Sequence, residues 1–167
     1  LEEIPKGLIN ESFLASEDGL KNLVLSQYYQ SRLIVEDLRF LGCYPSDLMT
    51  YSVNSSDAIE IGTLRVNTMP TLGAFSAPWK HLYTGINNIN FGLKVIKEKS
   101  FPNVATIEGE LSFLRAWYYL LTVETWGTGA HFATEPTTSV LTDGNQASID
   151  TFYTLILSDI DRAIVTL

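Results

Sequence analysis

The stretch GELSFLRAWYYLLTVETWG, residues 109–127, decides the fold of this chain. Apolar residues recur in and before it at intervals of three and four, which predicts a helix over about residues 104–126. Two faces of this helix are apolar: Ile107, Leu111, Leu114, Tyr118 and Leu121 form one, and Phe113, Trp117 and Leu120 form the other. A helix that is apolar on two faces is buried on both, so we expect it between other helices. Most of its aromatic side chains are therefore expected in the core, and not in an exposed sugar-stacking surface.

Arg115 lies among these apolar residues. A buried guanidinium needs an acidic partner, because an unpaired charge in the interior is costly. Glu110 and Glu124 are candidates, and so are the acidic residues of a neighbouring helix. We expect a structural ion pair and no catalytic role for Arg115.

Three further helices are predicted, over about residues 17–41, 77–99 and 148–167. Ser16 and Ser148 are expected N-caps, Pro78 is expected in the first turn of its helix, and Gly42 is expected to stop the first helix. Asn87, Asn88 and Asn90 are poor helix formers, so we expect them to bond to a neighbouring segment. The order and connections of the helices indicate an all-α fold of antiparallel helix pairs, of the α-solenoid type, with long irregular loops.

The last predicted helix carries a stripe that is still running where the sequence stops: Ile149, Phe152, Ile156, Ile160, Ala163 and Leu167. An amphipathic helix draws most of its stability from packing its apolar face. We therefore expect residues 1–167 to be a fragment of a longer chain, or to be completed by a second chain.

The composition excludes several classes of function. The 167 residues carry a net charge of −8, which argues against nucleic acid and anionic lipid as partners. Cys43 is the only cysteine, so the chain can form no internal disulfide, and neither His81 nor His131 has neighbours at metal-ligand spacing. No apolar run reaches the length of a membrane span. We expect no metal and no cofactor.

Three segments together resemble the amino-terminal part of the SusD/RagB family of Bacteroidetes outer-membrane nutrient-binding lipoproteins. The opening stretch is similar to the family's helix with a glycine–acid–x–x–phenylalanine–leucine–arginine–alanine motif, followed by tyrosines and Trp-Gly. WKHLYTGINNIN (79–90) resembles the family's preceding helix, and IDTFYTLILSDIDRAIVTL (149–167) resembles the next one. The start, LEEIPKG, looks like the family's sequence after the lipid anchor. The family's anchoring cysteine near the mature N-terminus is absent, and family chains are longer.

The resemblance implies tetratricopeptide-like helix pairs and a lipid-anchored protein on the extracellular face of the outer membrane. It implies a SusC-like TonB-dependent transporter as the partner, oligosaccharide or another nutrient as the ligand, and no catalysis. The motif residues Glu110, Phe113, Leu114 and Arg115 carry over as scaffold, not as ligand contacts.

The irregular connection over residues 43–74 is the preferred place for the ligand, because long loops are often functional. Sugar sites combine aromatic faces with amide, carboxylate or guanidinium groups. The connection offers Tyr44, Asp47, Tyr51, Asn54, Arg65 and Asn67. A solvated loop without a ligand remains an equal interpretation of the pattern.

Two other functions remain open. A helical-repeat scaffold could bind a protein or peptide in a groove, with no small-molecule ligand. A glycosidase would need two carboxylates across a sugar. Asp47 with Asp57, or Asp159 with Asp161, could form such a pair, but nothing except residue type marks them.

Overall fold

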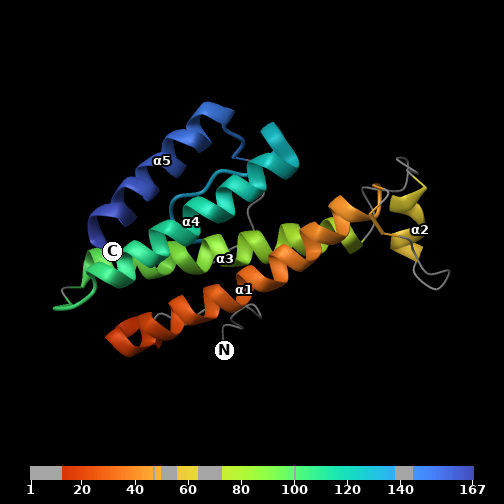
Figure 1. The fold of residues 1–167 in the computed structure, drawn as a ribbon. Helices are drawn as coiled ribbons and strands as arrows, with labels where there is room; N and C mark the ends of the chain where they lie inside the picture. The colour runs from red at the N-terminus through yellow and green to blue at the C-terminus, as the bar shows by residue number, and fades with distance from the viewer. Residues whose placement is uncertain (1–12, 47, 50–55, 64–72, 100, 138–144) are drawn as a thin grey trace, which may run out of the picture. The chain divides into compact units, whose positions relative to one another are not determined.

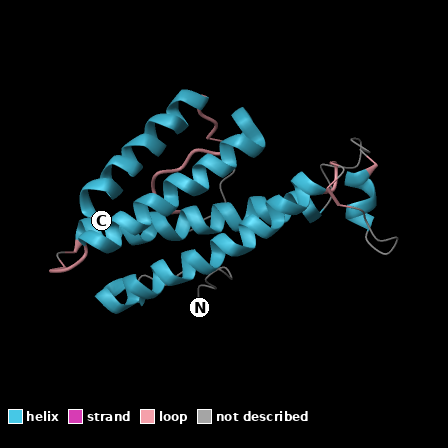
Figure 2. Ribbon diagram, in the orientation of Figure 1, coloured by secondary structure: helices cyan, strands magenta, loops and turns pink. Residues whose placement is uncertain are grey.

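The computed structural model describes residues 13–46, 48–49, 56–63, 73–99, 101–137 and 145–167. Within these residues the regular structure is helical, apart from an isolated antiparallel bridge between His131 and Gln146. The α-helices are α1 (Glu17–Cys43), α2 (Ser56–Gly62), α3 (Gly73–Glu98), α4 (Ala105–Trp126) and α5 (Ile149–Thr166) (Figure 1). Two short 3₁₀ helices are η1 (Phe13–Ala15) and η3 (Gly127–Gly129). Figure 2 shows that helices joined by loops make up the described part of the chain. The all-α prediction is confirmed.

The chain divides into two compact units, and α1 and α3 contribute residues to both. One unit is Leu1–Tyr28 with Tyr83–Leu167, and the other is Tyr29–Leu82. In the first unit α4 contacts α1, α3 and α5. The Tyr118 hydroxyl donates to the Gln27 carbonyl of α1 at 2.6 Å, and Arg115 bonds to Asn90 of α3 and Asp159 of α5. The predicted central position of this helix is therefore correct.

Neighbouring helices of this unit run antiparallel. Arg162, near the end of α5, bonds at 3.1 Å to Glu108 in the first turn of α4. At the other end, the rings of Tyr119 in α4 and Phe152 in α5 lie 5.5 Å apart. Contacts that pair the start of one helix with the end of the next define an antiparallel pair, as the sequence predicts.

Close approach of α3 to its neighbours depends on glycine. A Cβ atom added at Gly85 would lie 2.4 Å from the Tyr118 ring, and one at Gly92 would lie 2.5 Å from the Leu23 side chain. The two glycines are seven residues apart, so they lie on the same face of α3. Side chains here would push the helices apart.

Gly85→Ala is expected to destabilise the protein, although alanine favours a helix by about 1 kcal/mol. The Tyr118 ring is rigid and its hydroxyl is bonded, so overpacking should cost about 1–3 kcal/mol and leave a net loss. Gly42→Ala is the control, since a Cβ atom there meets nothing within 4 Å. Thermal melts should show opposite shifts for the two variants. A Gly85→Ala protein that melts at or above the wild-type temperature would contradict the close packing.

The second apolar face of α4 is less buried than the sequence predicts. Phe113 is 45% exposed, and Trp117 and Leu120 are half-buried. Tyr118 and Tyr119, in contrast, are fully buried. The prediction of burial on both faces is therefore wrong for this side of the helix, because the described residues cover it only in part.

The connection between the first two predicted helices includes a helix that was not predicted. It contains α2, which buries Ala58 and Ile61 three residues apart. The next helix begins at Gly73 rather than near Ala77, so Pro78 lies inside it and not in its first turn. The earlier start is explained by a capping residue from α2: the Asp57 carboxylate accepts a hydrogen bond from the Ala74 N–H of α3 at 2.9 Å. Such a cap satisfies an N–H group that has no partner within the helix.

The other predicted helix ends are close to those observed. Ser16 caps α1 by accepting from the Gly19 N–H at 3.0 Å, and Ser148 caps α5 by accepting from the Thr151 N–H. Gly42 is not a stop, because α1 continues to Cys43.

The apolar stripe of α5 is buried only in its middle. Phe152, Ile156 and Ala163 are buried, whereas Ile149 and Leu167 are exposed. Tyr153, Leu157 and Ile164 add exposed apolar surface on another face. The expectation of a partner for this helix stays a prediction.

Candidate functional site

Of the six predicted ligand residues, the structure describes Tyr44. The other five, Asp47, Tyr51, Asn54, Arg65 and Asn67, lie outside the described residues. Tyr44 directly follows α1 and is half-buried. Its ring packs at 4.2 Å, centroid to centroid, against Phe40 in the last turn of α1. The Tyr44 side chain therefore has a fixed neighbour on the helix.

Phe40 lines a pocket of about 540 Å³ in the same unit. One wall comes from α1, the second from the start of α2 and the third from the first turns of α3; the lining residues are Glu36, Asp37, Phe40, Ser56, Asp57, Gly73, Ala74 and Ala77. An aromatic ring beside carboxylates and a hydroxyl is the combination that holds a sugar, because the ring contacts C–H groups and the polar groups bond to hydroxyls.

Two carboxylates of this pocket are fixed by bonds to the scaffold. Asp37 bonds to Nδ1 of His81 at 2.7 Å, and Asp57 accepts from the Ala74 N–H. The His81 carbonyl in turn accepts from the Gln30 side chain at 3.1 Å. These bonds join α1 with α3, and α2 with α3, so the acidic side of the pocket has a defined geometry.

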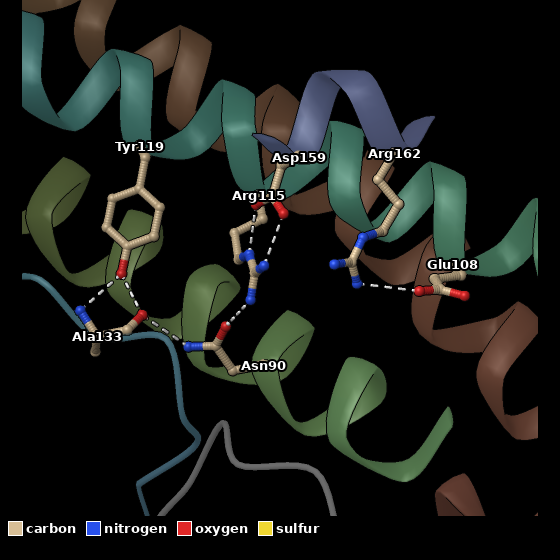
Figure 3. A network of polar contacts seen from close by, with 7 residues as sticks. All are labelled: Asn90, Glu108, Arg115, Tyr119, Ala133, Asp159 and Arg162. Carbon is tan, nitrogen blue, oxygen red and sulfur yellow. Dashed lines mark hydrogen bonds and ion pairs between the residues drawn. The ribbon is translucent and has the colours of Figure 1, made fainter. Parts of the chain in front are cut away.

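The other unit contains the motif arginine, whose partner is on α5. Arg115 donates through Nε and Nη2 to both carboxylate oxygens of Asp159, at 2.7 and 2.8 Å (Figure 3). Its Nη1 donates to the side-chain oxygen of Asn90 at 2.9 Å. Both charged side chains are buried. The predicted structural ion pair is present with an acid of a neighbouring helix, and Glu110 and Glu124 were the wrong candidates.

The remaining motif residues divide between the core and the surface. Leu114 is fully buried. Burial, the negative charge of Glu110 and a hydrogen bond to that carboxylate raise the pKa of Tyr28. Glu110 therefore links α4 to α1. Phe113 is 45% exposed, so it is not a core residue in this structure.

Residues 131–137, called here the strap, lie along α3 and α4 and are bound by their side chains. The Asn87 amide bonds to both the N–H and the C=O of Thr137, at 2.8 and 3.0 Å. The Tyr119 hydroxyl bonds in the same two ways to Ala133, whose carbonyl also accepts from Asn90 at 3.0 Å (Figure 3). Each side chain thus replaces the partner that a β-strand would give an extended backbone.

The prediction that the asparagines of this helix bond to a neighbouring segment is confirmed for Asn87 and Asn90. The tyrosines were missed, because their spacing indicated only core packing. Tyr83 repeats the arrangement of Tyr119, since its hydroxyl donates to the His131 carbonyl at 2.9 Å and accepts from the same residue's N–H. Burial raises the pKa of Tyr119 to about 12 and also raises that of Tyr83. Both hydroxyls therefore keep the proton that they donate to the strap.

The two histidines have separate structural partners. His81 bonds to Asp37, and Nδ1 of His131 accepts from the Asn145 N–H at 3.2 Å. Among the described residues, no group of three or more His, Cys, Asp or Glu side chains is arranged to hold a metal ion. Nor is any helix in this part of the chain long and apolar enough to cross a membrane.

Comparison with known families gives a match over most of the chain. The SusD-like_3 family, described as "Starch-binding associating with outer membrane", matches residues 9–167. No curated protein and no solved structure gives a significant match. The family match covers all five α-helices, including the Arg115 helix and the partner helix that carries Asp159. The chain therefore belongs to the SusD-like family of helical, starch-binding proteins that associate with the outer membrane.

Proposed function

We propose that this chain binds oligosaccharide, or another nutrient, at the cell surface and passes it to a SusC-like TonB-dependent transporter without catalysing a reaction. The observation that carries the proposal is the match of residues 9–167 to a starch-binding family. Delivery to the transporter, a lipid anchor and the extracellular position follow from the resemblance of the sequence motifs. Residues 1–167 would form the amino-terminal part of the complete binding protein, and no cofactor takes part.

We place the ligand at the end of α1, beside α2 and the start of α3. Tyr44 lies against Phe40, and Phe40 lines the pocket that also contains Asp37 and Asp57. The other candidates, Asp47, Tyr51, Asn54, Arg65 and Asn67, belong to the segments that precede and follow α2 in the sequence. The pocket volume of about 540 Å³ is typical of small-molecule sites.

The contacts of the acidic residues favour binding over hydrolysis. Asp159 is 1% exposed and holds Arg115, so it is not available to flank a sugar. Asp57 uses one carboxylate oxygen to cap α3. Each carboxylate pair suggested by the sequence thus includes one residue with a structural role, whereas a glycosidase needs both groups at the scissile bond.

The strap counts against the alternative of a peptide-binding groove. Tyr83, Asn87 and Tyr119 already bond to the backbone of residues 131–137. A peptide ligand would have to displace this segment and replace its hydrogen bonds. A scaffold function would therefore need a surface other than the strap-binding faces of α3 and α4.

Tyr44→Ala should weaken binding of a linear glucan such as maltoheptaose by about 2- to 10-fold, because an aromatic contact contributes about 0.5–1.5 kcal/mol. Isothermal titration calorimetry measures this change directly. Tyr153→Ala is the matched control, since Tyr153 is a half-exposed tyrosine of α5, in the other unit. The proposed site is wrong if both variants bind as the wild type does. Absence of binding by the wild type across a panel of oligosaccharides would contradict the function itself.

A further inference from the structure

A second pocket, of about 580 Å³, lies entirely within the unit that contains α4 and α5. Its walls include the aliphatic side chains of Leu93, Ile96 and Leu155, and Arg115 lines it as a buried residue. Thr134 and Glu135 of the strap are exposed and complete its lining. The volume is within the range of about 300–1,000 Å³ that small-molecule sites occupy.

The strap residues of this pocket are held from both sides. Ala133, directly before Thr134, is bound through its N–H and C=O by Tyr119 and Asn90. Thr137, two residues after Glu135, is bound in the same way by Asn87. The backbone that carries Thr134 and Glu135 is thus fixed at each end before any ligand arrives. Preorganisation of this kind lowers the entropy cost of binding.

Arg115 is equally fixed. Asp159 binds its guanidinium with two hydrogen bonds, and Asn90 accepts a third (Figure 3). Asn90 also bonds to Ala133, so the same side chain sets the position of the arginine and of the strap. One continuous network of hydrogen bonds therefore fixes the side of the pocket formed by Asn90, Arg115 and the start of the strap.

The charges of the pocket are balanced. Arg162 bonds to Glu108 at 3.1 Å, Lys94 lies 3.9 Å from Glu98, and Arg115 is neutralised by Asp159. Lys97 and Glu135 add one charge of each sign. A pocket with donors, acceptors and aliphatic walls but no net charge suits a neutral polyol, whose hydroxyl groups both donate and accept. An anion would gain no net Coulomb attraction here.

We propose that this pocket is a second saccharide subsite, which binds one or two neutral sugar rings against Leu93, Ile96 and Leu155. The assignment rests on the proposed function, because it takes the ligand class from the starch-binding family. It adds a place for that ligand to which none of the six predicted ligand residues contributes. The strap presents Thr134 and Glu135 to the sugar hydroxyls, and Lys94 and Lys97 donate from the α3 side.

The experiment is a calorimetric titration with maltose, a ligand short enough to occupy either site alone. Leu155→Trp fills the pocket, and Thr134→Trp obstructs it from an exposed position, where substitutions usually change stability little. Leu157→Trp is the control, because Leu157 is on the same helix and 60% exposed on another face. We expect both pocket variants to lose one of two binding events, or at least tenfold in affinity, while the control binds like the wild type.

Tyr44→Ala, measured beside them, separates this inference from the proposed function. If Tyr44→Ala weakens binding while Leu155→Trp and Thr134→Trp do not, the second subsite is wrong and the proposed function stands. If neither the wild type nor any of the variants binds maltose or a longer glucan, the proposed function is wrong as well.

A salt titration tests the ligand class. The affinity for a neutral sugar should differ by less than about twofold between about 0.05 and 0.5 M NaCl, because no net charge is screened. Glucuronate is the anionic comparison. If it binds more tightly than maltose and loses affinity in high salt, the pocket is an anion site and the assignment to a neutral saccharide is overturned.

Discussion

Replacing Asp159 by alanine is expected to lower the free energy of unfolding by about 3–5 kcal/mol, because it leaves a buried guanidinium without its carboxylate. Asp159 is 1% exposed and Arg115 is 7% exposed, so the charge that loses its partner lies in a largely buried position. Two hydrogen bonds, of 2.7 and 2.8 Å, disappear together. Urea denaturation followed by circular dichroism measures the change.

Asp161→Ala is the control, since Asp161 is an exposed residue of the same helix. Its removal should change the unfolding free energy by about 0.5 kcal/mol or less. A double variant, Arg115→Met with Asp159→Leu, should recover much of the loss, because well-packed apolar residues often replace a buried ion pair without cost. If Asp159→Ala is as mild as Asp161→Ala, the ion pair does not hold α4 to α5.

The need of Arg115 for a partner could be predicted from its apolar neighbours, but the partner could not. The two acidic residues that the sequence suggested by name, Glu110 and Glu124, are on the same helix as Arg115. Asp159 is 44 residues away and meets Arg115 only because α5 returns antiparallel to α4. Which acidic residue pairs with Arg115 depends on how the helices pack, and the periodicity of a single helix does not contain that information.

Long periodic segments could be predicted because each helix carries its own pattern, and the four predicted helices correspond to α1, α3, α4 and α5. The start of α3 was missed because the cap that fixes it, Asp57, comes from α2, 17 residues before Ala74. The seven-residue α2 was missed because its segment carries too few apolar positions to show a helical period. Both errors fall where structure depends on contacts from another part of the chain.

The residues of the candidate sites also include some that the sequence could predict and some that it could not. Residue type alone suggested Tyr44 as a ligand residue, and the structure places it against the aromatic wall of a pocket. Poor helix propensity indicated that Asn87 and Asn90 bond to a neighbour. Nothing in the sequence indicated that the hydroxyls of Tyr83 and Tyr119 bond to the backbone of the strap. A tyrosine that only packs in the core has the same helical spacing as one that also binds a neighbouring backbone. The pocket beside the strap therefore became visible only in three dimensions.

Phe152→Ala is expected to lower the free energy of unfolding by about 3–5 kcal/mol, the usual cost of removing a fully buried aromatic ring. Phe152 is 0% exposed, in the first turn of α5. Its ring contacts Tyr119 at 5.5 Å and meets Phe132 of the strap edge-on at 5.1 Å. The cavity would therefore loosen α5 and the strap together. Tyr153→Ala, next to it but 39% exposed, should cost about 1 kcal/mol or less.

Hydrogen exchange distinguishes a local effect from a global one. The N–H groups of Ala133 and Thr137 are bonded to Tyr119 and Asn87, so they report directly on the strap. In Phe152→Ala, at a temperature where α4 remains folded, the Ala133 N–H should exchange faster because Phe132 and Tyr119 lose their common neighbour. The Thr137 N–H should change less, since Asn87 on α3 does not contact Phe152 through any of these rings. If Phe152→Ala is destabilised but both N–H groups keep their wild-type protection, the aromatic cluster supports α5 alone, and the strap is held by its hydrogen bonds without help from the core.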